Sequence, residues 1–390
     1  MRKVVCILIV LTVYWGCKKP YLPVAISGNT NYLVVEGTIN TGQDSTIIRV
    51  SRTVKLASKL KSAAELNATV MVEGDDNSTY PVAETGNGYY KTFALNLSDS
   101  HKYRLKITAT DSKVYQSDFV PVKNSPPIDS VTYGPTTGGI GLFVNTHDAS
   151  NKTTYYRWNY VETYIIHAAF HSTMKLVTVP FDTVVIRPLD EQVYECWRND
   201  SSSNVILGSS AKLAQDVISH TQLTYVPIGS ERMGVRYSIL VTQTALTADA
   251  FNYWQNLKKN TEQLGSVFDA QPSEIQGNIH CVTNPSEPVI GYISAGTITR
   301  TRIFVDNRNL PPWTMPASGC LLKSYLLKDY DQAGHPIYPV RDNIYTGVVF
   351  PVNAIQPPGQ PILGYTGTGR ECADCTLRGT NKKPSFWVDD

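Results

Sequence analysis

Apolar residues recur at every second position along several segments of this chain, and this alternation constrains the fold more than any other feature. In segment 103–109, Tyr103, Leu105 and Ile107 lie on one face of an extended backbone. Segment 68–72 alternates in the same way. A period of two predicts strands of an antiparallel sheet with one buried face. We therefore predict an all-β fold, mainly strands with one or two helices.

Strand candidates of this kind fill residues 31–122, which we predict to form the first domain. Turns rich in glycine, asparagine and aspartate separate them, for example at 74–77. Many short strands joined by such turns predict an immunoglobulin-like β-sandwich. Pro126 and Pro127 then predict a linker at 123–128, because proline lacks a backbone donor and cannot continue a central strand.

The remainder, residues 129–390, predicts a larger β-rich domain with a helical insertion. A long strand is predicted at 154–166, with several aromatic residues and Glu162 on one face. Further strands are predicted at 236–242, 288–294 and 301–305. The helix is predicted at 247–260, because Thr247 can cap its N-terminus and an apolar stripe at helical spacing follows. The stripe consists of Phe251, Trp254 and Leu257.

The N-terminus carries two positive charges and then about 13 mostly apolar residues that end just before Cys17. This is a signal-peptide pattern, and the apolar run is shorter than the roughly 20 residues that a transmembrane helix needs. Gly16 followed by cysteine resembles the lipobox of bacterial lipoproteins. We predict a signal peptide at 1–16, a lipidated Cys17 and a tether at 17–30, which anchor the protein to a membrane. The alternative is an ordinary cleaved signal peptide, with Cys17 incidental.

Net charge bears on the partners of the mature chain. The formal charge of the whole chain is +2, and it falls to about zero once Arg2 and Lys3 leave with the signal peptide. Nucleic-acid binding needs a basic face, so we predict no nucleic-acid partner. The 23 tyrosines suit strands and also surfaces that bind other molecules.

Five cysteines remain when Cys6 is removed with the signal peptide and Cys17 is lipidated. They are Cys196, Cys281, Cys320, Cys372 and Cys375. An exported chain lies in an oxidising space, so we predict disulfides among them. Because five is odd, at most two bridges form and one thiol stays free. A metal site or redox activity at the C-x-x-C of residues 372–375 is the alternative, but no second C-x-x-C accompanies it.

Three histidines were tested as metal ligands. His167 and His171 are four residues apart, which on a helix would present two ligands to zinc, but the glutamate of that motif is missing and the preceding residues are strand-like. His280 lies beside Cys281, and adjacent strand residues point to opposite faces. We predict no metal, no cofactor and no catalytic residue, since no nucleophile elbow, Walker or dinucleotide-binding motif occurs. The protein is therefore not expected to be an enzyme.

Several short strings in the chain also resemble one known family as a set. They are 246–248 with 253–254, 265–269, 277–279, 281–285, 289–292, and the closing 372–375 with 379–380 and 383–387. Together they resemble the Gram-negative outer-membrane lipoproteins of the "domain of unknown function 4249" family. The resemblance covers nearly all of the mature chain, and its C-terminal strings are the most specific.

The resemblance implies an outer-membrane location beside TonB-dependent receptors, and it supplies no catalytic residues. We therefore expect a lipid-anchored binding accessory of such a receptor, which captures a ligand or caps the receptor. One alternative is a surface structural or adhesion protein without a small ligand. A second is a hydrolase whose active site the sequence does not show. Whether the protein faces the periplasm or the cell exterior stays open.

Overall fold

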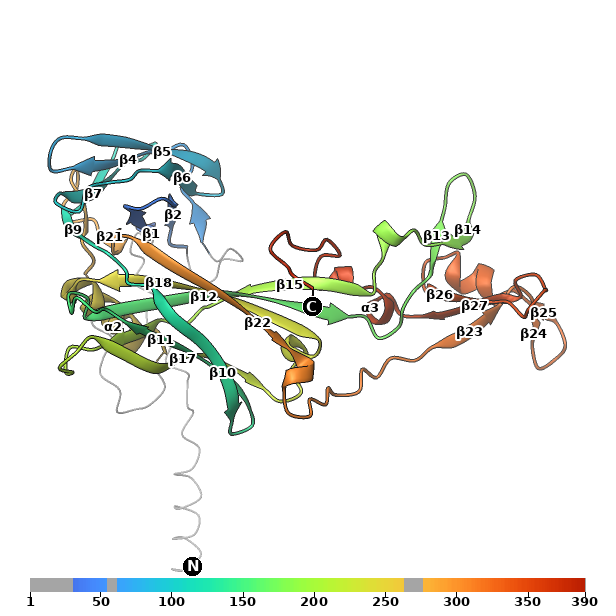
Figure 1. Ribbon diagram of the computed structural model, residues 1–390. Coiled ribbons are helices and arrows are strands. Elements are labelled where there is room, and N and C mark those ends of the chain that lie inside the picture. Colours follow the sequence, from blue (N-terminus) through green and yellow to red (C-terminus); the bar gives the residue numbers. More distant parts are fainter. Residues whose placement is uncertain (1–30, 55–61, 263–275, 390) are drawn as a thin grey trace, which may run out of the picture.

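The computed structural model describes residues 31–54, 62–262 and 276–389. The predicted signal peptide, Cys17 and the tether lie outside these residues. Strands dominate the described chain, so the predicted all-β fold class is confirmed (Figure 1). None of the helices in the described ranges is long and apolar enough to cross a membrane.

The first body is a 12-stranded sheet whose pairings run in a closed ring, and we call it the barrel. Its strands are β1 (Leu33–Asn40), β2 (Ser45–Arg52), β3 (Ala63–Ala64), β4 (Thr69–Gly74), β5 (Thr79–Gly86), β6 (Tyr89–Ala94), β7 (Lys102–Thr108), β8 (Val114–Ser117), β9 (Val120–Lys123), β19 (Ile279–Cys281), β20 (Val289–Gly291) and β21 (Ser294–Gly296). The ring closes because β5 joins β4 to β6 and β9 joins β21 to β7. As the alternation predicts, Tyr103, Leu105 and Ile107 of β7 are buried in its core.

Residues 279–296 return to the barrel after a long excursion along the chain. Both β20 and β21 pair in parallel with β1, and β19 pairs with β8. Ile279 and Ile293 complete the barrel core, which is why this segment packs here. The predicted second domain, 129–390, is therefore interrupted, and the strand expected at 288–294 belongs to the first body. These pairings do not establish the immunoglobulin-like topology, which stays a prediction.

The second body is a two-layer sandwich. One layer contains β10 (Ile128–Thr136), β11 (Gly139–His147) and β17 (Val217–Pro227). The other contains β12 (Tyr155–His167), β15 (Glu195–Ser201), β16 (Ile206–Ser209), β18 (Arg236–Leu246) and β22 (Ile298–Asp306), with the short turns η2 (Glu231–Met233) and η3 (Asn307–Asn309). Tyr156, Trp158 and Tyr164 of β12 lie on one face and pack against Leu142 and Val144 of the first layer.

Helix α2 (Ala248–Glu262) confirms the predicted helix and lies against both bodies. The backbone N–H of Ala250 donates to Thr247 Oγ1 at 3.1 Å, so Thr247 caps the helix as expected. Tyr253 is buried and its ring lies 5.2 Å from that of Tyr292, which precedes β21 of the barrel. Trp254 is half-buried on the sandwich side, over β12.

The third part, which we call the arm, projects from one end of the sandwich (Figure 1). It contains β13 (Met174–Val177), β14 (Thr183–Ile186), β23 (Lys323–Leu326), β24 (Asp329–Tyr330), β25 (Pro336–Ile337), β26 (Phe350–Ile355), β27 (Gly364–Thr368), α3 (Arg370–Ala373) and the short turns η1 (Leu189–Glu191), η4 (Val340–Ile344) and η5 (Cys375–Leu377). Its core is small, with Met174, Val340, Ile344, Val349 and Tyr365 among its members.

Candidate functional site

One disulfide attaches the arm to the sandwich, and a second lies within the arm. Cys375 bonds Cys196 of β15, and Cys372 bonds Cys320 just before β23, with Cα–Cα distances of 5.7 and 5.8 Å. The prediction of two bridges and one free thiol is confirmed. The two cysteines of the C-x-x-C join different partners, so they are not available to a metal. Cys281 is wrong as a disulfide candidate, because β19 carries it into the barrel core away from the other cysteines.

The histidine pair meets on an aromatic ring. His167 stacks on Tyr194 at 4.5 Å and His171 lies edge-on to the same ring at 5.0 Å. His167 Nε2 also lies 3.1 Å from a carboxylate oxygen of Glu195. His280 is exposed, 3.4 Å from Asp118. Within the described ranges, no three histidine, cysteine, aspartate or glutamate side chains gather in a way that could hold a metal.

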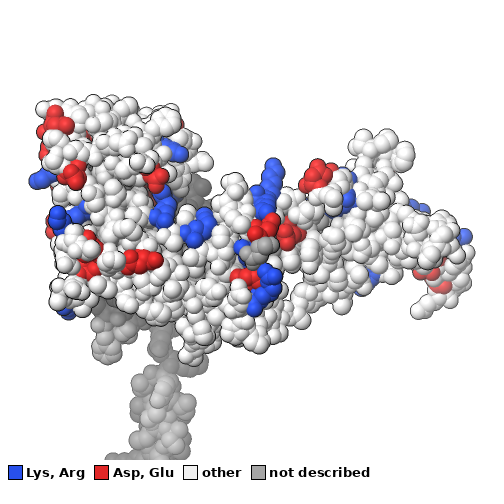
Figure 2. Space-filling view, in the orientation of Figure 1, with Lys and Arg blue, Asp and Glu red and all other residues white. Residues whose placement is uncertain are grey.

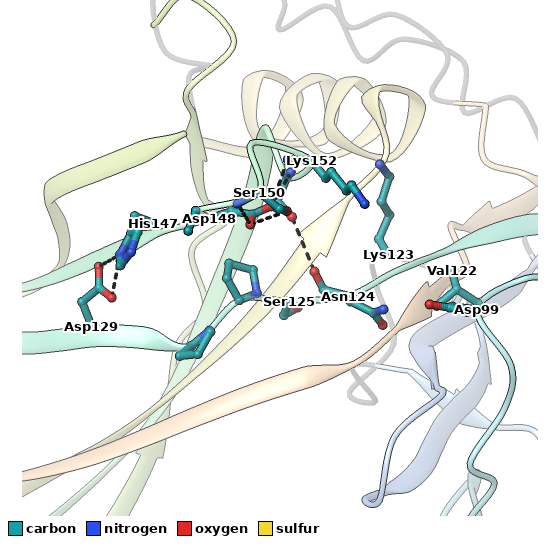
Figure 3. Close-up of a pocket in the computed structure, with 14 residues that line it drawn as sticks. Asp99, Val122, Lys123, Asn124, Ser125, Asp129, His147, Asp148, Ser150 and Lys152 are labelled. Carbon is teal, nitrogen blue, oxygen red and sulfur yellow. Dashed lines mark hydrogen bonds and ion pairs between the residues drawn. The ribbon is translucent and has the colours of Figure 1, made fainter. Parts of the chain in front are cut away.

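A cavity of about 720 Å³ lies where the linker meets the sandwich (Figure 3). Asp129 of β10 and His147 of β11 face each other across neighbouring strands, with His147 Nδ1 2.8 Å from Asp129 Oδ2. This contact raises the pKa of His147, first through the hydrogen bond and then through the charge of Asp129. Ser150 Oγ donates to Asp148 and does not reach His147. The histidine–carboxylate pair therefore lacks a hydrogen-bonded nucleophile in the described chain.

Asp148 organises the turn that borders this cavity. Its carboxylate accepts hydrogen bonds from the backbone N–H groups of Ser150, Lys152 and Thr153 at 2.9 to 3.0 Å. Burial alone would raise the pKa of Asp148, but these hydrogen bonds outweigh it and lower the pKa to about 2. Asp129 and Asp148 of the cavity are thus engaged in local structure.

A second cavity of about 760 Å³ separates the barrel from the sandwich, and we call it the cleft. Strands β1 and β2 of the barrel form one wall, and the outer faces of β12, β18 and β22 form the other. Helix α2 contributes Trp254 and Leu257. Hydroxyl groups recur in its lining, among them those of Thr38, Ser45, Tyr89, Thr242 and Thr244.

Arg157 is the distinctive residue of the cleft. It alternates along β12 with Tyr156 and Trp158, which point into the sandwich core, so its own side chain points out of the sandwich. Its guanidinium carbon lies 3.5 Å from the centroid of the Trp254 ring. Its Nε is buried and has no hydrogen-bond partner in the described chain. Burial lowers the pKa of Arg157 to about 10, against the opposing effect of the Glu36 charge.

The other two cations that line the cleft are already paired. Arg49 donates to a carboxylate oxygen of Glu36 at 3.2 Å, and Arg300 pairs with Asp44. Neither pair includes Arg157. The cleft therefore holds one positive charge that no carboxylate of the described chain neutralises within ion-pair distance.

The arm presents a third surface, around the hairpin of β13 and β14. Val179, Phe181 and Ile186 are 79%, 70% and 77% exposed. Beside them lies a groove of about 600 Å³ between the hairpin and β26, lined in part by Leu176 and Phe350. Figure 2 shows that charged side chains gather over the barrel and at the base of the arm on this face, while most of the arm is uncharged.

Residues 18–302 match the model of a family described as "Domain of unknown function (DUF4249)". The chain belongs to this family. The match spans the barrel and ends within β22, so the arm strands from β23 onward lie beyond it. No curated protein matches the chain.

Arg157 of this DUF4249 protein was not among the residues predicted from the sequence to be functional. The alternation of Arg157 with Tyr156 and Trp158 already predicts that it points away from the sandwich core. The apolar stripe that contains Trp254 predicted the helix but not a contact with Arg157. The local sequence does not show that the barrel lies over the outer face of β12 and encloses the side chains of Arg157 and Trp254.

Proposed function

We propose that this protein is an outer-membrane-anchored lipoprotein that serves as a binding accessory of a TonB-dependent receptor. The anchor is the acylated Cys17, which follows a short apolar segment and a small residue. The accessory role is either capture of a ligand in the cleft or capping of the receptor. The face of the membrane on which it acts is left to experiment.

The apolar hairpin of the arm is the observation that carries this proposal. Three large apolar side chains stand exposed on one short hairpin, next to a groove. Contiguous exposed apolar surface on a protein marks a site of protein or membrane interaction. The Cys196–Cys375 disulfide ties the arm to β15 of the sandwich, and Cys320–Cys372 ties two segments of the arm together, so the surface of the arm is held in place. An arm of this kind suits contact with a large partner.

The alternatives receive less support. A purely structural or adhesive role predicts no concave aromatic pocket, whereas the cleft is concave and includes Trp254 and Tyr89. A hydrolase needs a nucleophile beside its base, and in the described residues His147 contacts only the Asp129 carboxylate. Neither role explains an exposed apolar hairpin on an arm fixed by disulfides.

Affinity capture of the intact lipidated protein from solubilised outer membranes tests the proposal. We expect a TonB-dependent receptor to co-purify with the parent protein. The double variant Phe181→Ser with Ile186→Ser should reduce the receptor yield. The matched control is Leu213→Ser, which replaces an exposed apolar residue on a sandwich turn and should leave the yield unchanged.

Two further results decide the outcome. The Cys17→Ala variant should move from the membrane fraction to the soluble fraction. Recovery of the parent protein as a lone monomer from cells grown under several conditions would overturn the receptor assignment. Continued pelleting of Cys17→Ala with the membrane would overturn the anchor.

A further inference from the structure

Arg157 holds a positive charge in the cleft that no carboxylate of the described residues pairs with. A buried charge is costly unless it is paired and hydrogen-bonded. The chain follows this rule elsewhere, because Arg232 donates to both oxygens of the buried Glu162 at 3.0 and 3.2 Å. Arg157 departs from it, since its Nε is buried without a partner and its guanidinium contacts the Trp254 ring but no carboxylate among the described residues. Pairing with an anion would compensate this charge.

The contact with Trp254 also sets how such an anion would be held. At 3.5 Å from the ring centroid, the guanidinium stacks on the indole, so its N–H donors point sideways into the space around the ring. A planar guanidinium donates two parallel hydrogen bonds to a carboxylate. Stacking on the indole reduces the rotamer freedom that a ligand would otherwise have to remove. The geometry favours a carboxylate group over a diffuse negative surface.

The remaining lining of the cleft indicates what carries the carboxylate. Side-chain hydroxyls recur on both walls beside apolar residues such as Leu240 and Ile298. They belong to Ser202, Thr242 and Thr244 of the sandwich and to Thr38 and Ser45 of the barrel. Hydroxyl groups both donate and accept, which suits the hydroxyls of a sugar. The volume of about 760 Å³ lies within the range of small-molecule sites and holds a few sugar rings.

We propose that the cleft binds an acidic oligosaccharide, with Arg157 receiving a carboxylate of one sugar and Trp254 fixing the guanidinium that receives it. This inference rests on the proposed ligand-capture function and names its ligand class. Arg49 and Arg300 keep their own carboxylate partners and shape the walls.

Calorimetric titration of the full-length protein with trigalacturonate tests the proposal. We expect saturable binding by the parent protein and a loss of affinity of roughly tenfold or more for Arg157→Gln. Arg157→Lys keeps the charge but not the fork of donors, so its loss should be intermediate. The matched control Arg341→Gln, on an exposed arginine of the arm paired with Asp342, should bind as the parent does.

The uncharged trisaccharide of galactose separates charge from shape. The parent protein should bind it more weakly than trigalacturonate, and Arg157→Gln should bind the two sugars alike. Trp254→Phe should weaken trigalacturonate binding less than Arg157→Gln does. Equal affinity of the parent and Arg157→Gln for trigalacturonate overturns the proposal. Absence of saturable binding to a panel of galacturonate, glucuronate and sulfated oligosaccharides overturns it as well.

Two other measurements separate the proposal from an acidic peptide ligand and from a structural role of Arg157. Tighter binding of triglutamate than of any sugar in the panel would overturn the proposal in favour of an acidic peptide. A structural role for Arg157 predicts a large fall in the thermal midpoint of Arg157→Gln without ligand, whereas we expect a midpoint equal to or above that of the parent. If trigalacturonate binds but no receptor co-purifies, the receptor assignment fails and the ligand assignment stands.

Discussion

The sandwich and the arm hold their strands together by different means. The sandwich buries large aromatic side chains completely, with Trp158, Tyr156 and Tyr237 at its centre. The arm buries a handful of smaller residues and leaves apolar side chains such as Phe181 exposed. Two disulfides supplement this small core. The difference indicates that the sandwich is a scaffold, whereas the arm keeps its apolar surface outside for another molecule.

The largest expected effect comes from opening the disulfides. Removal of Cys196–Cys375, which spans 179 residues, should lower the free energy of unfolding of the part that it closes by about 5 kcal/mol in the chain-entropy account. Removal of Cys320–Cys372, which spans 52 residues, should lower it by about 4 kcal/mol. Limited proteolysis of the two double alanine variants should cleave the arm while the barrel and sandwich stay intact.

Cys281→Ala is the matched control for this prediction, because it removes a buried thiol without opening a bridge. It should leave the cleavage pattern of the arm unchanged. An arm that resists protease as well in the double variants as in the parent would break the comparison, since its own core would then suffice.

The second effect is confined to the sandwich. Glu162 is buried and accepts hydrogen bonds from Arg232 and, at 2.8 Å, from the hydroxyl of Tyr237. Arg232→Ala leaves this carboxylate without its cation, so the free energy of unfolding should fall by about 3 kcal/mol. The exposed pair of Arg341 and Asp342 in the arm provides the control, because Arg341→Ala should leave the free energy of unfolding unchanged. If urea unfolding shows the same loss of unfolding free energy for Arg232→Ala and Arg341→Ala, the contrast in burial is contradicted.

The third effect lies at the linker and depends on pH. Hydrogen bonds lower the pKa of Asp148 from 3.8 to about 2, so its contribution is present above pH 4 and is lost as the pH falls towards 2. Asp148→Asn removes this contribution. Because Asp148 is only partly buried and solvent screens its interactions, we expect a loss of only about 1 kcal/mol at pH 7. Unfolding curves of the parent and the variant should converge near pH 2, and a difference that persists there would contradict the assignment.

Much of the fold could be predicted from the sequence where a strand has one buried face. The alternation at Tyr103, Leu105 and Ile107 and at Tyr156 and Trp158 placed these side chains on the correct face. The return of residues 279–296 to the barrel could not be predicted. Strands of three residues carry no measurable period, and nothing local to the sequence states which distant strand they pair with.

The candidate site shows the same limit. Counting cysteines predicted two bridges and one free thiol, but the partners depend on which segments meet in space, so Cys281 could not be set apart from the others. The direction of Arg157 was implied by its neighbours on β12. Its lack of a carboxylate partner depends on two ion pairs that no local pattern predicts. Arg49 pairs with Glu36 within the barrel, and Arg300 pairs with Asp44 across the cleft.

The smallest expected effect on stability belongs to the hairpin of the arm. Phe181 and Ile186 are mostly exposed, so replacing both by serine removes little buried apolar surface. We expect the free energy of unfolding to change by less than about 0.5 kcal/mol, as it should for Leu213→Ser on the sandwich. A loss of several kcal/mol from the hairpin variant alone would mean that these side chains support the arm itself. Unchanged stability together with a lower receptor yield would instead locate their role in contact with another molecule.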